Sequence, residues 1–207
     1  MDNHEKAYFT QLEARVIACL MEKHLTTPKN YPLTLNSLVL ACNQKSNREP
    51  VMNLTEGQVG HTVNILKERG LVGVDYGGRS NHISHRVMNS LDLDRKKQAI
   101  LTVLMLRSPQ TLNEIKTRTN RMTDFADFSE ISLLLQNMIE NDKQKVILIP
   151  KSMGTREDRY THQLCGEIDI KQVCVSAPRS STNKQSDLEQ RVSILEEKLE
   201  KLMQLLN

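Results

Sequence analysis

Apolar residues recur at intervals of three and four positions along much of this chain, which is the spacing of helices with one buried face. In the first half, three such stretches have inward stripes that include Val16, Leu38 and Val63. Two strand-like runs, 71–76 and 82–88, follow them and are joined by a turn, 77–81, that contains two glycines and an asparagine. Such a turn between two strands predicts a β-hairpin. The first half therefore predicts three helices and then a hairpin.

The starts of the helices are marked by polar capping residues. A Thr followed three residues later by Glu or Gln forms a capping box, in which each side chain accepts a backbone N–H of the first turn. This pattern occurs at 10–13, 55–58 and 111–114. Gly70 follows the third helix, where a residue able to adopt a left-handed conformation closes a helix. Further starts are expected at Thr34, at Asp92 or Asp94, and at Asp127.

The same order of elements recurs in the second half. Helical stripes there include Ile100, Ile115 and Leu135, and strands are expected over 145–150 and 158–165. Few residues are identical between the two halves, so the repeat is one of architecture. Three helices followed by a hairpin is the order of a winged helix-turn-helix domain, whose third helix and hairpin are the parts that meet DNA.

We therefore predict an α+β, mainly helical fold with two tandem winged helix-turn-helix domains, at residues 7–90 and 91–175. Residues 176–187 are rich in serine and other polar residues and predict a flexible linker. A heptad pattern follows over 188–206 and predicts a coiled-coil helix.

The heptad favours a homodimer. β-branched and leucine residues at the a positions with leucine at d lean toward a two-stranded coiled coil. The alternative is a helix that stays solvated or docks on its own chain. The a positions are Val192, Leu199 and Leu206, and the d positions are Leu188, Leu195 and Leu202.

Composition excludes several function classes. A net charge of +3 is too small for a protein that coats nucleic acid, so any DNA contact must come from local patches. The four cysteines lack paired spacing, and Cys19 lies on an apolar helix face, where we expect a buried thiol.

No signal peptide or membrane span is visible, so we expect a soluble cytoplasmic protein. Motifs for catalysis, phosphate binding and zinc are missing, so we expect no enzyme, cofactor or metal.

The third helix of the first half carries the candidate DNA-reading residues. With Val59 facing the core, the opposite face holds Gln58, His61 and Asn64, whose side chains can hydrogen-bond to base edges. A solvated polar face would show the same residues. Phosphate contacts are expected from nearby cations, namely Lys45, Arg48, Lys67, Arg79 and Arg86.

The hairpin and one loop add to this expectation. His82 and His85 join the two arginines to make the hairpin basic, but they are three residues apart on a strand and so cannot share a metal. The loop 43–48 carries Lys45 and Arg48, although its amides can instead hydrogen-bond to backbone in successive turns.

The corresponding helix of the second half has the opposite character. No Lys or Arg occurs over 129–142, and the outward face carries Glu130, Glu140 and Leu133. Carboxylates are repelled by phosphates, whereas an outward leucine suits contact with protein. We therefore expect this half to pack or dimerise, with Leu133 at the contact.

The run over 30–51, NYPLTLNSLVLACNQKSNREPV, together with TREDRY over 155–160, resembles the YceH-like family of uncharacterised bacterial proteins. The similarity covers about residues 7–170. The resemblance implies a tandem winged-helix fold in a cytoplasmic bacterial protein. It brings no activity with it, because a fold alone does not establish a function.

Two hypotheses of function follow. The first is a dimeric protein that binds double-stranded DNA, a transcriptional regulator that uses the first domain for DNA contact. The alternative is a protein-interaction adaptor, similar to the paired winged helices of the chromosome-segregation subunits that bind a kleisin. The small net charge and the acidic helix of the second half motivate the alternative.

Overall fold

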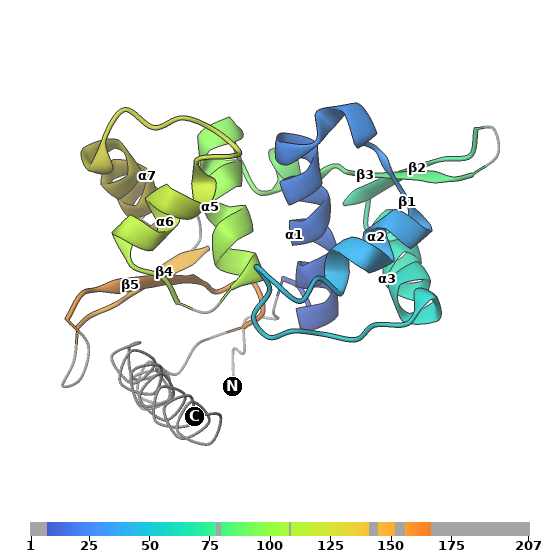
Figure 1. The fold of residues 1–207 in the computed structure, drawn as a ribbon, viewed down its shortest axis with the longest axis horizontal. Coiled ribbons are helices and arrows are strands. Elements are labelled where there is room, and N and C mark those ends of the chain that lie inside the picture. Colours follow the sequence, from blue (N-terminus) through green and yellow to red (C-terminus); the bar gives the residue numbers. More distant parts are fainter. Residues whose placement is uncertain (1–7, 78–79, 108, 141–144, 152–155, 167–207) are drawn as a thin grey trace, which may run out of the picture. The chain divides into compact units, whose positions relative to one another are not determined.

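The computed structural model describes residues 8–77, 80–107, 109–140, 145–151 and 156–166. Over these residues the protein is α+β and mainly helical, with two small antiparallel sheets (Figure 1). All described elements belong to one compact unit that ends at Ile168. The predicted linker 176–187 and the predicted heptad 188–206 lie outside the described residues.

Helix α1, Gln11–Thr26, lies at the centre of the first half, where it contacts α2, α3 and β3. Its inward face is fully buried, including Val16 and the predicted buried thiol Cys19. The other elements of this half are η1 Pro28–Asn30, β1 Leu33–Thr34, α2 Leu35–Cys42, α3 Glu56–Glu68, β2 Val72–Asp75, β3 His82–His85 and α4 Val87–Ser90.

The first sheet has the strand order β1-β3-β2, so β3 is its central strand. Leu33 and Val74 are both paired with Ile83, and the buried side chain of Ile83 fixes the face that meets the helices. The sequence did not predict β1, because two residues are too short to show an alternating pattern. It also extended the last strand to residue 88, whereas β3 ends at His85 and α4 follows.

The second half has the element order predicted for it. An isolated antiparallel bridge joins Gln110 to Tyr160 just before α6, as β1 precedes α2 in the first half. The elements are α5 Arg95–Leu106, α6 Leu112–Thr119, α7 Phe128–Glu140, β4 Val146–Ile149 and β5 Arg159–His162.

The predicted helix starts are present. Thr10, Thr55 and Thr111 each form a complete capping box with the residue three positions later. Asp94, one of the two candidates for its helix, accepts the N–H of Lys97 at 2.8 Å. Gly70 has a φ of +71°, as expected for a residue that closes a helix.

The two halves share one hydrophobic core. Helices α1 and α5 lie side by side (Figure 1), and the buried core runs from Phe9 in the first half to Leu164 in the second. Backbone hydrogen bonds also join the halves, from Phe9 N–H to the Leu164 carbonyl at 2.8 Å and from Glu49 N–H to the Leu106 carbonyl at 2.8 Å. The two halves are thus packed together along α1 and α5.

Candidate nucleic-acid interface

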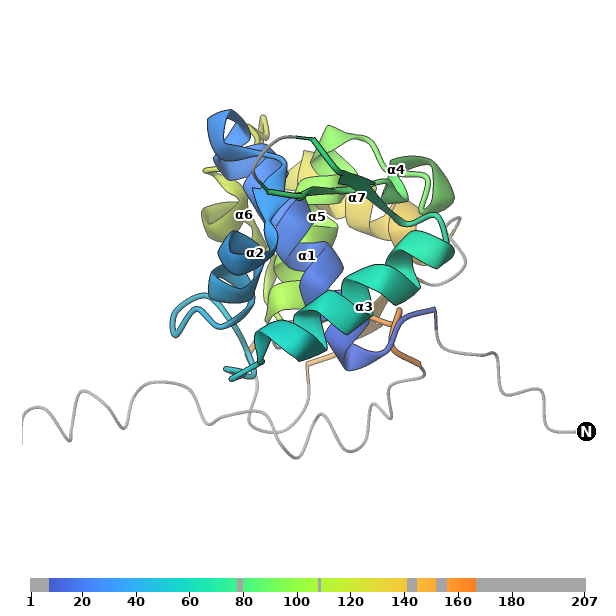
Figure 2. The same cartoon turned by 90° about the vertical axis from the view of Figure 1, so that its right-hand side faces the viewer.

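Helix α3 packs one face on the core and presents the other to solvent. Val59, Val63 and Leu66 are buried, as the pattern predicted. His61 and Asn64 are exposed, and neither side chain has a hydrogen bond or ion pair to any residue that the structure describes. Figure 2 shows α3 lying across the front of the first half. The side chains of His61 and Asn64 are therefore accessible to a ligand.

Gln58 lies on the same helix but already has a structural role. Its carboxamide oxygen accepts the backbone N–H of Thr55 at 2.9 Å and the Thr55 hydroxyl at 3.2 Å. These bonds complete the capping box of α3. Hydrogen bonding to a base through this oxygen would break the cap, which contributes about 1 kcal/mol. The exposed amide N–H groups of Gln58 make no such bond, so Gln58 stays a candidate for a base contact as a donor, beside His61 and Asn64.

Lys67 joins the end of α3 to the hairpin. Its ammonium group donates a hydrogen bond to the Tyr76 hydroxyl at 2.7 Å and lies 4.9 Å from the centre of the Tyr76 ring. Both residues are exposed. The charge of Lys67 therefore stays at the surface, held beside the end of β2.

Arg86 follows β3 and is also exposed. A Cβ atom built on Gly73 of β2 would lie 2.6 Å from Arg86 Nε, so the guanidinium lies directly against this glycine. A residue with a side chain at position 73 would displace Arg86. His82 is half-buried, and Arg79, expected at the tip of the hairpin, lies outside the described residues.

Arg48 is not available to a phosphate, which corrects the expectation from the sequence. Its side chain is 0% exposed and forms a two-pronged ion pair with Glu22, at 2.6 and 3.2 Å. Its Nε also donates to the Ala41 carbonyl at 3.0 Å. The sequence could not show this, because Glu22 lies on α1, twenty-six residues away in the chain.

Other buried contacts hold the same loop in place. Arg15 donates to the carbonyls of Cys42 at 3.2 Å and Pro50 at 2.7 Å. The Asn43 side chain bonds to both the N–H and the carbonyl of Leu54, each at 2.8 Å. Asn43 thus bonds to backbone, but eleven residues away and not within the successive turns that the sequence offered as an alternative. Lys45, in contrast, is exposed on this loop.

His85 is likewise not part of a basic surface. Only 9% of it is exposed, and its Nε2 lies 3.0 Å from His24 Nδ1. Its backbone N–H donates to the Tyr31 hydroxyl at 2.7 Å, and Gln98 Nε2 lies 3.4 Å from the same ring nitrogen. Burial, with a smaller effect of His24, lowers the pKa of His85 to about 4. The imidazole is therefore neutral near pH 7.

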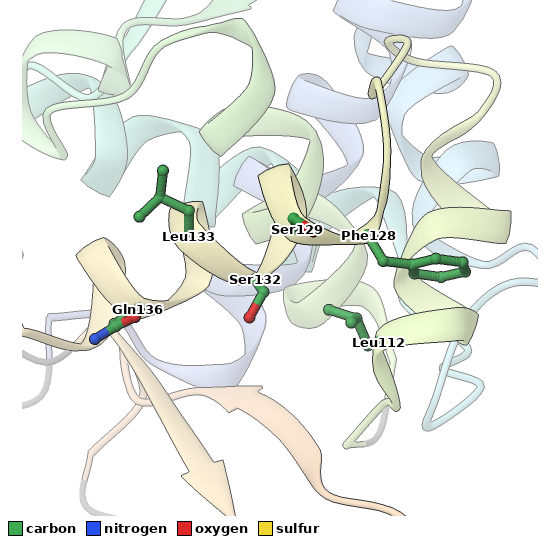
Figure 3. A pocket seen from close by; sticks show the side chains of 6 residues that line it. All are labelled: Leu112, Phe128, Ser129, Ser132, Leu133 and Gln136. Atoms are coloured by element: carbon green, nitrogen blue, oxygen red, sulfur yellow. The ribbon is translucent and has the colours of Figure 1, made fainter.

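The second half presents a different surface. A shallow groove of about 440 Å³ lies between α6 and α7 (Figure 3). Leu133 is 61% exposed and Phe128 is 43% exposed at this groove. The outward position predicted for Leu133 is confirmed. The residues that line the groove are Leu112, Phe128, Ser129, Ser132, Leu133 and Gln136.

Sequence reasoning missed Phe128 and the cluster around His85. Phe128 was overlooked because it is the first residue of α7, outside the periodic stripe, although an aromatic residue at a helix start was a visible signal. The cluster joins His24, Tyr31, His85 and Gln98 from four separate segments. No spacing in the sequence reports such long-range contacts.

Neither a metal site nor a membrane-spanning helix is found among the described residues. No three of their His, Cys, Asp and Glu side chains are grouped as metal ligands. Within the same residues, every helix is too short or too polar to cross a membrane.

Comparison with known proteins shows the family. The family described as "Protein of unknown function, DUF480" matches residues 9–155. A UPF0502 protein of Cellvibrio japonicus is 46% identical over 196 residues, which cover 93% of this chain and 90% of that protein. A UPF0502 protein of Vibrio campbellii is 42% identical over 198 residues, with 91% of each chain covered. These matches confirm the resemblance noted from the sequence. The chain therefore belongs to the DUF480 family of UPF0502 proteins.

Proposed function

We propose that this protein is a transcriptional regulator of the cytoplasm that binds double-stranded DNA through its first half, and that each half is a winged helix-turn-helix domain. The element order of the first half and its strand order β1-β3-β2 support this fold. In that architecture α3 is the helix that enters the major groove, and the β2–β3 hairpin lies beside the backbone.

The exposed pair His61 and Asn64 on α3 is the observation that carries the proposal. The two residues are three positions apart on a helix and so lie on one face. Asn can make paired hydrogen bonds to adenine, and His can donate to an acceptor on a base edge. Their side chains are accessible and have no described partner, so binding costs no existing contact.

Exposed cations near this helix are available for phosphate contacts. Lys67 and Arg86 are held near the hairpin, and Lys45 lies on the loop before α3. Arg79 stays in the proposed set on the basis of the sequence. Glu68, the last residue of α3, lies at the end farther from the N-terminal residues that enter the groove deepest.

The second half is assigned to protein contact. Its α7 contains no Lys or Arg. Glu130 is ion-paired with Lys96, whereas the exposed Glu140 would be repelled by a phosphate backbone. Contact with another protein would remove the exposed apolar surface of Leu133 and Phe128 from water, which is favourable.

A salt titration tests DNA binding. Anisotropy of a labelled mixed-sequence duplex is measured against the full chain at several salt concentrations. Four phosphate contacts per chain give a slope of log affinity against log salt of about −3.6, and a dimer that engages both first halves gives about −7. A flat salt response, or no binding near about 50 mM salt, would overturn the proposal.

Substitutions then locate the surface. Arg86→Glu should weaken binding to all sequences alike, because phosphate contacts carry no sequence information. His61→Ala with Asn64→Ala should lower the preference for a selected site by about 1–3 kcal/mol per lost base contact. Arg121→Glu is the matched control, an exposed cation just after α6 in the second half. Equal losses for Arg86→Glu and Arg121→Glu would contradict the assignment to the first half.

A protein-interaction adaptor is the second candidate function, and the groove between α6 and α7 is the observation that favours it. Pull-down from a nuclease-treated bacterial lysate separates the two. A stoichiometric protein partner that is retained after nuclease treatment and lost with Leu133→Glu supports the adaptor. Failure to recover such a partner counts against it.

A further inference from the structure

We infer that α7 is the contact helix of a homodimer, in which Leu133 of each copy fills the groove between α6 and α7 of the other. This inference rests on the proposed role of the second half as the protein-contact half. It adds the partner, which is a second copy of this chain, and the arrangement, which is an antiparallel pair of α7 helices.

One face of α7 carries both a projection and a recess. Ser129, Ser132, Leu133 and Gln136 follow the spacing i, i+3, i+4, i+7 and therefore share one face of the helix. The two serines are small, so another side chain can approach the helix closely beside them. Leu133 projects next to them and is 61% exposed (Figure 3). A helix with this face can pack on a second helix of the same sequence.

A two-fold axis fits this face. In a two-fold dimer the same patch is used by both copies, so residue i of one meets residue j of the other and the reverse. With the axis between residues 132 and 133, an antiparallel pair of α7 helices brings Leu133 of each copy over Ser129 and Ser132 of the other. Leu112 and Phe128 form the apolar wall at one end of the groove (Figure 3).

One cation and one carboxylate near opposite ends of α7 are complementary in this arrangement, although Asp127, which caps the start of the helix, is also exposed there. Lys116 of α6 lies over the Phe128 ring, with Nζ 4.2 Å from the ring centre, at the start of α7. Glu140 is the last residue of α7 and is exposed. An antiparallel pair places the start of each α7 beside the end of the other. Lys116 of one copy then meets Glu140 of the other, and the symmetry makes this ion pair twice.

A parallel pair would lack this complementarity. It would place Glu140 of one copy beside Glu140 of the other, and like charges that meet across an interface are unfavourable. The macrodipoles of two parallel helices also oppose their association, whereas those of antiparallel helices favour it. The Lys116–Glu140 pair and the helix macrodipoles therefore favour the antiparallel arrangement.

Sedimentation equilibrium of the full chain without DNA tests the inference. Leu133→Glu should raise the dimer dissociation constant by at least about tenfold, because it places two carboxylates in the apolar contact. Leu40→Glu is the matched control, since Leu40 is 64% exposed on a helix of the first half. It should leave the dissociation constant unchanged. Both positions are exposed, so both variants are expected to fold, which circular dichroism checks.

A charge exchange tests the orientation. Lys116→Glu and Glu140→Lys should each weaken the dimer several-fold, and the variant with both changes should regain most of the affinity. A wild-type chain that is monomeric at about 100 μM overturns the inference. Equal dissociation constants for Leu133→Glu and Leu40→Glu overturn it as well, and place the dimer contact elsewhere.

The outcome is separable from that of the DNA proposal. A monomer that binds DNA with the expected salt slope refutes only the dimer contact. A dimer that depends on Leu133 but does not bind DNA refutes only the function proposed for α3.

Discussion

Replacing Arg48 with methionine separates a structural role from a role in binding. The Arg48 side chain is 0% exposed and that of Glu22 is 13% exposed, and their closest atoms are 2.6 Å apart. Arg48→Met keeps the apolar stem of the side chain but removes the guanidinium. It leaves the largely buried Glu22 carboxylate with only the Lys23 ammonium, 3.6 Å away, and it removes the 3.0 Å donor of the Ala41 carbonyl.

The expected loss of stability is large. Removing one partner of a buried ion pair costs about 3–5 kcal/mol when the remaining charge is left without compensation. Because Lys23 still lies 3.6 Å from the Glu22 carboxylate, we expect a loss at the lower end of this range. Glu22→Gln leaves the guanidinium unpaired and should also destabilise. The double variant Arg48→Met with Glu22→Gln should lose less than the sum of the single losses, by about 1–3 kcal/mol.

Urea unfolding followed by far-UV circular dichroism measures these losses. The matched control is Lys45→Met, an exposed cation on the same loop, which should change stability by less than about 0.5 kcal/mol. At equal concentrations of folded protein, Lys45→Met should weaken DNA binding and Arg48→Met should not. A loss below about 1 kcal/mol for Arg48→Met, with weakened DNA binding, would refute the structural role.

Lowering the pH and substituting two glycines give two further predictions. Because burial lowers the pKa of His85 to about 4 from its ordinary 6.5, its contribution to stability is complete above pH 6.5 and falls as the pH drops toward 4. Between pH 7 and about 4.5 the wild type should therefore lose about 2–3 kcal/mol more stability than His85→Gln, and equal losses would contradict this. Gly70→Ala should destabilise by about 1 kcal/mol, since its φ is +71°. Gly57→Ala, on the exposed face of α3 with nothing within 4 Å of the added Cβ, should instead stabilise by up to about 1 kcal/mol. Unfolding in urea compares the two, and losses of similar size would rule out the conformational explanation.

The sequence predicted the helices and hairpins because their signals are local. Thr10, Thr55 and Thr111 each act within one turn, and the buried stripe of α3 repeats every three or four residues. Strand β1 was missed because its two residues are held by pairing with β3, fifty positions away. The end of β3 was misplaced because Val87 continues an apolar pattern while belonging to a helical turn.

The candidate site was predicted less well, for the same reason. A cation is visible in a sequence, but its partner is not. Arg48 and Lys45 look alike on one loop, yet one is buried against Glu22 and the other is exposed. His85 and His61 also differ only in what the fold places around them. The prediction of which residues of α3 and α7 face the core and which face solvent was correct, because helical periodicity alone decides it.

The packing of α1 on α5 determines how this protein can be dissected. Leu25 of α1 forms a small buried cluster with Ala99 and Val103 of α5, and Gln98 donates to the Met21 carbonyl at 3.3 Å. A fragment cut between the halves would uncover these apolar surfaces on both pieces and favour aggregation. Work on either half is therefore better done with single surface substitutions in the intact chain than with truncated pieces.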